Sequence, residues 1–214
     1  MRRDLTASII AAVVFTVLFG LAYPLFTTGV AQVLFGDKAD GSRVERDGET
    51  VGSKLIAQSF MTREEIPPDE RGKFGKKAIK TPDPNYFQPR PSVTGYSGNV
   101  TFFNNLGPNN KALSQMFRGF LDDYLELEGP YTPGLADGDV PVDAVTTSGS
   151  GVDPHISVAN ARIQANRVAD VRGLSLDRVN ELIDDNTDNR DLGVLGESGV
   201  NVLELNLALD EEGQ

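Results

Sequence analysis

The chain has 214 residues, no cysteine and a formal net charge of −11 at pH 7. The lack of cysteine excludes a disulfide framework, a thiolate metal site and a cysteine nucleophile. Removing Arg2, Arg3 and Asp4 leaves 18 basic and 30 acidic residues, a formal charge of −12, and a surface of that sign repels the phosphates of nucleic acids and anionic lipid headgroups. We therefore expect no nucleic acid partner.

An uncharged segment runs from Leu5 to Gly36. Roughly 20 apolar residues wound as a helix cross the hydrocarbon core of a lipid bilayer, and Ile9 to Phe26 has nearly that length. Residues 1–36 are therefore predicted to form a cytoplasmic tip and a single transmembrane helix. Because juxtamembrane arginines stay preferentially in the cytoplasm, Arg2 and Arg3 predict a single-pass protein of the cell (plasma) membrane whose main domain lies outside the cytoplasm.

A cleaved signal peptide is the competing interpretation of this segment. Gly29-Val30-Ala31 has the small-x-small pattern of a cleavage site. Against it, the apolar segment is longer than the roughly 7 to 15 residues of a secretory core, and apolar residues continue at Val33, Leu34 and Phe35. We favour an uncleaved anchor, and both interpretations place the rest of the chain outside.

Residues 37–61 predict a juxtamembrane segment, with a polar tether or short hairpin up to Gly52 and a first strand from Ser53 to Phe60. Residues 62–91 contain six prolines, mixed charges and no usable hydrophobic period, so they predict a charged, Pro-rich surface loop. At its end, Pro89 and Pro91 hold the backbone extended around an arginine, next to an aromatic pair. We interpret this stretch either as a contact with a partner or as a contact that fixes the loop to the domain.

Residues 92–214 predict the remainder of a mixed α+β (α/β) exterior domain. We expect a helix starting at Asn109 or Asn110, whose apolar residues from Leu113 to Leu125 follow one helical face and form core. A strand is expected from Pro141 to Thr147, and two helices are expected to start at the capping residues Ser157 and Ser175. Alternating leucines predict a final half-buried strand from Val202 to Leu209. The polar residues Asn160, Gln164 and Arg167, spaced by four and three, are expected to face water.

The Gly/Ser loop from Ser148 to Ser157 has several possible interpretations. As a phosphate cradle it lacks the lysine of G-x-x-x-x-G-K-[ST]. As a hydrolase site, His155 would be the base for Ser148 or Ser150 and Asp143 or Asp153 would orient it, but no G-x-S-x-G elbow surrounds either serine. One histidine with scattered carboxylates does not make a metal site. The remaining interpretation is a structural turn, so we expect no catalytic residue and no metal.

The order of motifs resembles the C-subunit family of the Kdp potassium-transporting P-type ATPases. The resemblance spans nearly the whole chain, and its SGSG-x-DPHIS and VNVLELNLALD blocks are long. After the N-terminal span, its blocks are Tyr86-Phe87 with Arg90-Pro91-Ser92, Asn105-Leu106-Gly107-Pro108, Pro141-Val142-Asp143, Ser148-Gly149-Ser150-Gly151 with Asp153-Pro154-His155-Ile156-Ser157, Gln164 with Arg167-Val168-Ala169, and Val200 to Asp210.

The resemblance implies a non-catalytic subunit of an ATP-driven potassium uptake complex. Its partners would be a channel-like subunit that carries K⁺ and a P-type ATPase subunit, since no DKTGT-like nucleophile motif occurs in this chain. It further implies an assembly role and a catalytic chaperone role that raises the ATP affinity of the ATPase subunit, with ATP bound at Gln164 and Arg167. The chain has no cofactor of its own. The positions expected to contact partners are Tyr86, Phe87, Arg90, Asn105, Ser148, Gly149, Ser150, Gly151, Asp153 and His155.

The topology conflicts with direct nucleotide binding, because ATP is cytoplasmic whereas Gln164 and the Gly/Ser loop should lie outside. We therefore prefer a mechanical role, in which the anchor packs among partner helices and the exterior domain steadies the channel mouth. Two alternatives stay open. A membrane-anchored extracytoplasmic sensor or ligand-binding module would use the loops at 86–92 and 148–157, and an exported serine hydrolase would depend on His155.

Overall fold

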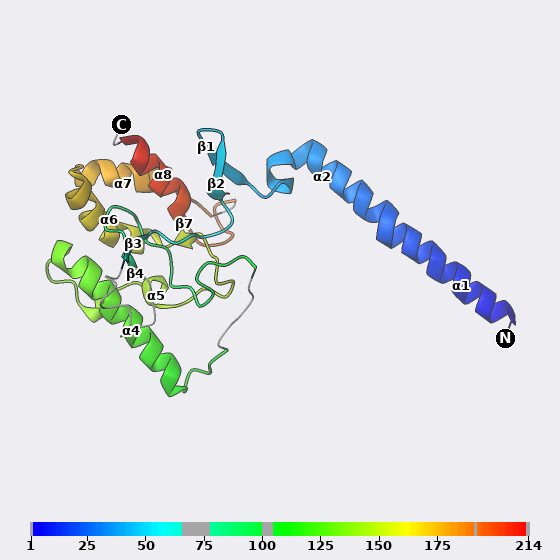
Figure 1. Ribbon diagram of the computed structural model, residues 1–214, viewed down its shortest axis with the longest axis horizontal. Helices are drawn as coiled ribbons and strands as arrows, with labels where there is room; N and C mark the ends of the chain where they lie inside the picture. The colour runs from blue at the N-terminus through cyan, green and yellow to red at the C-terminus, as the bar shows by residue number, and fades with distance from the viewer. Residues whose placement is uncertain (1, 66–77, 100–104, 191, 213–214) are drawn as a thin grey trace. The chain divides into compact units, whose positions relative to one another are not determined.

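The structure is a computed structural model that describes residues 2–65, 78–99, 105–190 and 192–212 (Figure 1). It divides into two compact units, Met1–Ser53 and Lys54–Gln214. The first unit contains a long helix and a hairpin, and the second contains a mixed helix-and-sheet domain. This arrangement confirms the predicted fold class, an α/β domain on one N-terminal helix.

A helical segment of 38 residues, Arg2–Ala39, fills most of the first unit and is kinked at Phe35, where φ is −142° and ψ is 42°. Among the described residues it is the one helix long and apolar enough to cross a membrane. It consists of α1 (Arg2–Val17), a π-helical turn at Leu18–Ala22 and α2 (Tyr23–Ala39). Pro24 is the second residue after the π-helical turn. Because proline lacks an N–H and crowds the preceding turn, the wider turn accommodates it without ending the helix.

A two-stranded hairpin of β1 (Arg43–Arg46) and β2 (Glu49–Ser53) follows the helix. Asp47 and Gly48 at its tip both have positive φ, at 54° and 80°, as a type I′ turn requires. The predicted short hairpin is therefore confirmed. The predicted strand from Ser53 to Phe60 is wrong, because the chain turns after β2 and the Ala57 amide donates to the Val152 carbonyl at 2.9 Å.

The predicted surface loop at 62–91 is wrong in part, because it contains a second hairpin. Strands β3 (Met61–Glu65) and β4 (Ala78–Pro82) pair antiparallel, with Met61 opposite Pro82. The Thr62 and Thr81 hydroxyls lie 2.7 Å apart across the pair. The middle of the predicted loop, 66–77, lies outside the described residues.

The core of the second unit lies between helices and a small antiparallel sheet of order β5-β7-β6, formed by β5 (His155–Ile156), β6 (Thr187–Asp188) and β7 (Gly199–Asn201). Helices α6 (Val158–Arg172), α7 (Leu176–Asp185) and α8 (Val202–Glu212) contribute to this core. The long helix α4 (Lys111–Glu128) packs against α6 at the edge of the domain (Figure 1). Shorter turns of helix occur at η2 (Gly129–Tyr131), η3 (Asp137–Asp139) and α5 (Val142–Val145). The buried apolar cluster comprises Phe87, Ile156, Ala161, Ala165, Val168, Ala169, Val179, Leu182, Ile183, Val200, Val202, Leu205 and Leu209.

The predicted helix caps are confirmed. Ser157 Oγ accepts from the Asn160 amide at 3.1 Å, and Ser175 Oγ accepts from the Arg178 amide at 3.2 Å. Gly173 ends α6 with φ +68°, the left-handed conformation that glycine adopts without a Cβ penalty.

Two predicted strands are helices. Residues 202–209 belong to α8, and Asn201 explains the start of that helix, because its Oδ1 accepts from the Leu203 and Glu204 amides at 3.2 and 3.3 Å. The predicted strand from Pro141 to Thr147 contains the short helix α5 instead. The apolar face of α4 is covered only in part, since Tyr124 and Glu128 are its buried residues and Leu113 is half-buried.

Candidate functional site

Segment 84–88 lies between helices α6 and α8 and is bonded by their side chains. The Asn206 amide group bonds both backbone groups of Phe87, accepting from its N–H at 2.9 Å and donating to its carbonyl at 3.0 Å. Gln164 bonds Gln88 in the same way, at 2.7 and 3.1 Å. Two side-chain amides thus replace the neighbouring strand that would otherwise pair with this extended backbone.

The Arg167 guanidinium also bonds the backbone of segment 84–88. Its Nε donates to both oxygens of Glu128 at 3.0 and 3.1 Å, and its Nη1 donates to the carbonyls of Pro84 and Tyr86 at 2.5 and 3.1 Å. Its Nη2 donates to Gln164 Oε1 at 3.2 Å. Arg167 and Glu128 are both fully buried, and burial raises the pKa of the Glu128 carboxyl while Arg167 opposes that rise.

The network continues toward the start of α6. Asn160 Oδ1 accepts from the Tyr124 hydroxyl at 2.9 Å and from Gln164 Nε2 at 3.0 Å. Asn160 Nδ2 donates to Asp143 at 3.0 Å, and Asp143 also accepts from the Ser157 amide and hydroxyl at 2.8 and 2.7 Å. Burial is the main cause that raises the pKa of Tyr124 far above its usual value.

The prediction that Asn160, Gln164 and Arg167 face water is therefore wrong. Their exposed fractions are 1%, 1% and 0%. Regular spacing identified their common helical face, but that face meets the unpaired backbone of segment 84–88 instead of solvent. We name Asn160, Gln164, Arg167 and Asn206 the polar template, because together they bond this segment or position the groups that do.

The Gly/Ser loop forms a turn that is held by hydrogen bonds between its own serine hydroxyls and backbone amides. Ser148 Oγ accepts from the Gly151 amide at 2.9 Å, and Ser150 Oγ accepts from the amide two residues on at 3.2 Å. The Gly151 carbonyl accepts from the Ser92 and Thr94 hydroxyls at 2.6 and 3.2 Å. These contacts agree with the structural-turn interpretation and join the loop to the residues after Arg90.

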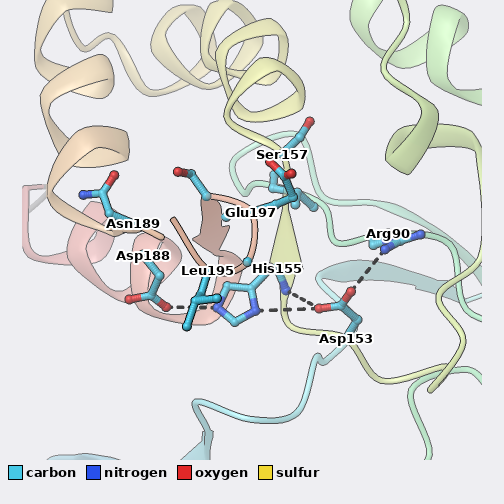
Figure 2. Close-up of a pocket in the computed structure, with 12 residues that line it drawn as sticks. Arg90, Asp153, His155, Ser157, Asp188, Asn189, Leu195 and Glu197 are labelled. Atoms are coloured by element: carbon cyan, nitrogen blue, oxygen red, sulfur yellow. Dashed lines mark hydrogen bonds and ion pairs between the residues drawn. The ribbon is translucent and has the colours of Figure 1, made fainter. Parts of the chain in front are cut away.

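An open pocket of about 580 Å³ lies beside this turn and contains Arg90, Asp153 and His155 (Figure 2). Arg90 Nη1 lies 3.2 Å from Asp153 Oδ2. The His155 ring lies between two carboxylates, with Nδ1 3.7 Å from Asp153 Oδ1 and Nε2 3.1 Å from Asp188 Oδ2 (Figure 2). The side-chain contact with the Asp153 carboxylate is the main cause that raises the pKa of His155, and the contact with His155 is the main cause that lowers the pKa of Asp153.

Asp188 is the pocket residue that sequence reasoning missed. It lies 33 residues after His155, and no local pattern joins the two positions. Antiparallel pairing of β5 and β6 with β7 between them brings the two side chains together. Only the three-dimensional fold supplies this contact.

The catalytic arrangements considered from the sequence are not assembled. In the described part of the chain, the side chains of Ser148, Ser150 and Asp143 form hydrogen bonds with groups other than His155. The same described residues contain no group of three or more histidine, aspartate or glutamate side chains placed to hold a metal ion.

The remaining candidate residues lie in other parts of the second unit. Asn105, Ser148 and Gly149 line a smaller pocket of about 310 Å³ together with Leu113 and Met116 of α4.

The aromatic pair has one buried and one half-buried member. Phe87 is in the core, and the Tyr86 hydroxyl donates to Asp210 at 3.0 Å. Arg172 lies over the Tyr86 ring, 4.7 Å from its centroid. Both aromatic side chains therefore fix segment 84–88 to the domain.

The fold and the site define a protein with one helix suited to crossing a membrane and one folded domain. In that domain, buried polar side chains bond the backbone of the same chain. The chain belongs to the family described as the C chain of K⁺-transporting ATPases (KdpC), whose family model matches residues 5–211. It is 45% identical over 212 residues to the potassium-transporting ATPase KdpC subunit of Mycobacterium tuberculosis H37Rv, covering 98% of this chain and 99% of the relative. The corresponding subunit of Rhodospirillum rubrum is 45% identical over 214 residues, covering 99% and 97%, and that of Polaromonas naphthalenivorans is 44% identical over 213 residues, covering 98% and 95%. The resemblance noted in the sequence is thus confirmed, and the chain is a subunit of a potassium-transporting ATPase.

Proposed function

We propose that the chain is a non-catalytic subunit that supports assembly of the potassium uptake complex and does so mechanically. Its apolar helix packs among helices of a channel-like, K⁺-translocating subunit and a P-type ATPase subunit. Its N-terminus faces the cytoplasm, because Arg2 and Arg3 precede the span. The folded domain, which lies in the part of the chain with a formal charge of −12, then lies outside the cytoplasm.

The state of Gln164 is the observation that carries this proposal. Its oxygen accepts two hydrogen bonds, from Gln88 and Arg167, and its nitrogen donates two, to Gln88 and Asn160. A primary amide offers two N–H donors and one oxygen with two lone pairs, so this capacity is filled by the protein itself.

Arg167 likewise donates hydrogen bonds to acceptors within the protein, and it is fully buried. A nucleotide phosphate at this site would have to displace Glu128 and leave a buried carboxylate unpaired, which is costly. We infer that these two residues shape the domain, and that any increase in ATP affinity of the ATPase subunit comes through assembly of the complex instead of direct ATP contact at Gln164 and Arg167.

Co-purification tests the assembly role. The chain is tagged at its C-terminus, membranes are extracted in mild detergent, and potassium-stimulated ATPase is assayed with and without this chain. We expect a channel-like subunit and a P-type ATPase to co-purify, with activity lost when the chain is omitted. Recovery of the chain alone and monodisperse would contradict the proposal and favour a sensor or ligand-binding module.

Equilibrium dialysis of the purified full chain against MgATP tests the nucleotide part of the proposal separately. We expect no saturable binding. Saturable binding that the exposed control Arg162→Ala retains and Gln164→Ala removes, with both variants folded, would overturn the mechanical interpretation.

A further inference from the structure

A pocket of about 430 Å³ lies beside α4 and shares no described lining residue with the pocket around His155. Most of its lining is apolar or aromatic. The proline and aromatic residues among the lining are Pro82, Pro89, Pro91, Tyr96, Phe120 and Tyr124. Pockets for small molecules typically have a volume of roughly 300–1,000 Å³ and a mostly apolar lining, with a few polar groups that orient the ligand. This pocket has that size and that lining.

Asp123 is the one charged side chain among the described residues that line this pocket. It shares one face of α4 with three other lining residues, Phe120, Tyr124 and Leu127. Its carboxylate is exposed and forms no ion pair with a described residue. The charged groups around His155 are paired with one another, whereas the charge of Asp123 is available to a ligand.

The polar template holds two of the lining residues in place. The Tyr124 hydroxyl donates to Asn160, and both backbone groups of Gln88 are bonded by Gln164. These bonds exist without a ligand. A preformed pocket gives up little conformational freedom when a ligand binds, and this favours affinity.

Tyr96 is fixed on the wall of the pocket in an unusual conformation. Its φ is +62°, in the left-handed region that residues with a Cβ avoid. Its amide donates to Ser92 Oγ at 3.1 Å, and its hydroxyl donates to the Arg90 carbonyl at 2.9 Å. Strained residues that their surroundings hold in this way cluster at ligand-binding positions.

The chemistry of the pocket favours an organic cation. A carboxylate attracts positive charge, and aromatic rings attract it further through their faces. An anion would meet the charge of Asp123 with no described basic side chain in the lining to offset it. A metal ion such as Ca²⁺ takes roughly six to eight oxygen ligands, whereas most of this lining is apolar.

We propose that this pocket binds a small organic cation, a substituted ammonium group on an apolar body. Asp123 balances the charge, and Tyr96, Phe120 and Tyr124 provide the aromatic surface. The inference goes beyond the proposed function and does not depend on it, because the lining residues all belong to the second unit.

Calorimetric titration of the full chain in a nonionic detergent tests the proposal, with benzyltrimethylammonium as the probe. Benzyl alcohol, which has the same ring and no charge, is the comparison compound. We expect saturable binding of the cation, and binding of benzyl alcohol weaker by about tenfold, the effect of losing one charge contact.

Substitutions on α4 locate the binding site. We expect Asp123→Asn to weaken binding of the probe by about tenfold. Asp122 is the matched control, because it is the exposed neighbour of Asp123 and does not line the pocket. Asp122→Asn should change affinity by less than about twofold, since solvent screens its charge. Phe120→Leu keeps an apolar side chain but removes the ring, and it should weaken binding by about threefold.

Three results would each overturn the inference, provided that the variants keep the melting temperature of the original chain. These are no saturable binding of the probe, equal affinity for benzyl alcohol, and equal weakening by Asp123→Asn and Asp122→Asn. None of them bears on co-purification with partner subunits, so the proposed function would stand.

A substituted ammonium group could come from a free molecule or from a lipid headgroup, and the same titration in nanodiscs distinguishes these sources. A headgroup ligand would compete with the probe in phosphatidylcholine nanodiscs and not in phosphatidylglycerol nanodiscs. A free ligand would leave the affinity for the probe equal in both. No saturable binding in phosphatidylglycerol nanodiscs would contradict the inference for either source.

Discussion

The second unit contains two clusters of polar side chains with opposite surroundings. The polar template on α6 and α8 is buried, and its amides and guanidinium bond backbone groups of segment 84–88. The cluster around His155 lies in an open pocket, and its charges bond one another. The difference shows that the residues which a family resemblance assigns to ligand binding can be internal supports, whereas the accessible charged groups lie elsewhere.

Loss of Arg167 should have the largest effect on the buried cluster. Arg167→Ala leaves Glu128 buried without its partner, and breaking a buried ion pair costs about 3–5 kcal/mol. We expect a loss of that size in the free energy of unfolding, measured by denaturant titration of the full chain in detergent. Arg162 is on the same helix and forms an exposed ion pair with Asp184, so Arg162→Ala should change stability by less than about 1 kcal/mol. Similar losses in the two variants would show that burial of the Arg167–Glu128 pair adds nothing to its contribution to stability.

Removal of the Asn206 amide should have the next largest effect. Asn206→Ala leaves the N–H and carbonyl of Phe87 without their partners, and each buried unsatisfied group costs about 1–3 kcal/mol. We expect a stability loss of about 2–4 kcal/mol, measured by the same titration. The exposed Asn189 provides the control, and Asn189→Ala should stay within about 0.5 kcal/mol of the original chain. A neutral result for Asn206→Ala would remove the main support for the template.

A smaller effect is expected in the Gly/Ser turn beside the open pocket. Gly151 has φ +72°, and an added Cβ would lie 3.0 Å from the Thr94 side chain. Gly151→Ala should therefore cost about 1–2 kcal/mol. Gly149 has open space around it and no positive φ, so Gly149→Ala should be nearly neutral in the same denaturant titration. The reverse order would show that the turn does not require its left-handed glycine.

The smallest effect is expected at His155, because its ring is partly exposed and solvent screens its ion pairs. Its pKa is raised above 6.5 by Asp153 and Asp188, so protonation stabilises the folded state. That contribution is fully present below about pH 6.5 while both carboxylates are ionised, and it is lost as pH rises through the raised pKa. We expect His155→Gln to be less stable than the original chain by under about 1 kcal/mol at pH 6, with a smaller difference at pH 9. A difference that grows with pH would contradict this assignment.

Local signals in the sequence predicted the parts of the fold that local chemistry determines. The long apolar helix, a short hairpin before Gly52, and the caps at Ser157 and Ser175 were each indicated by a few neighbouring residues. The alternating leucines after Asn201 led to the wrong prediction of a strand. Leu203, Leu205 and Leu209 are all buried, but they belong to the helix α8. The capping side chain of Asn201 was the available signal for that helix.

The candidate sites were predictable only where one segment contains them. Asp153 and His155 are neighbours in the sequence, and Arg90 was identified by the prolines around it, but their joint pocket with Asp188 depends on strand pairing. The burial of Gln164 could not be inferred from helical spacing, because spacing gives the face of a helix and not what covers it. Segment 84–88 covers that face, and it lies 76 residues away from Gln164 in the sequence.

Amide hydrogen exchange at Phe87 and Gln88 tests the central claim most directly, because these two N–H groups donate to Asn206 and Gln164. The full chain is measured in detergent, with and without a large excess of MgATP. The account predicts slow exchange at both amides without nucleotide and no change when MgATP is added. Fast exchange at both amides, or a change in protection on adding MgATP, would contradict the claim that these side chains support the chain's own backbone.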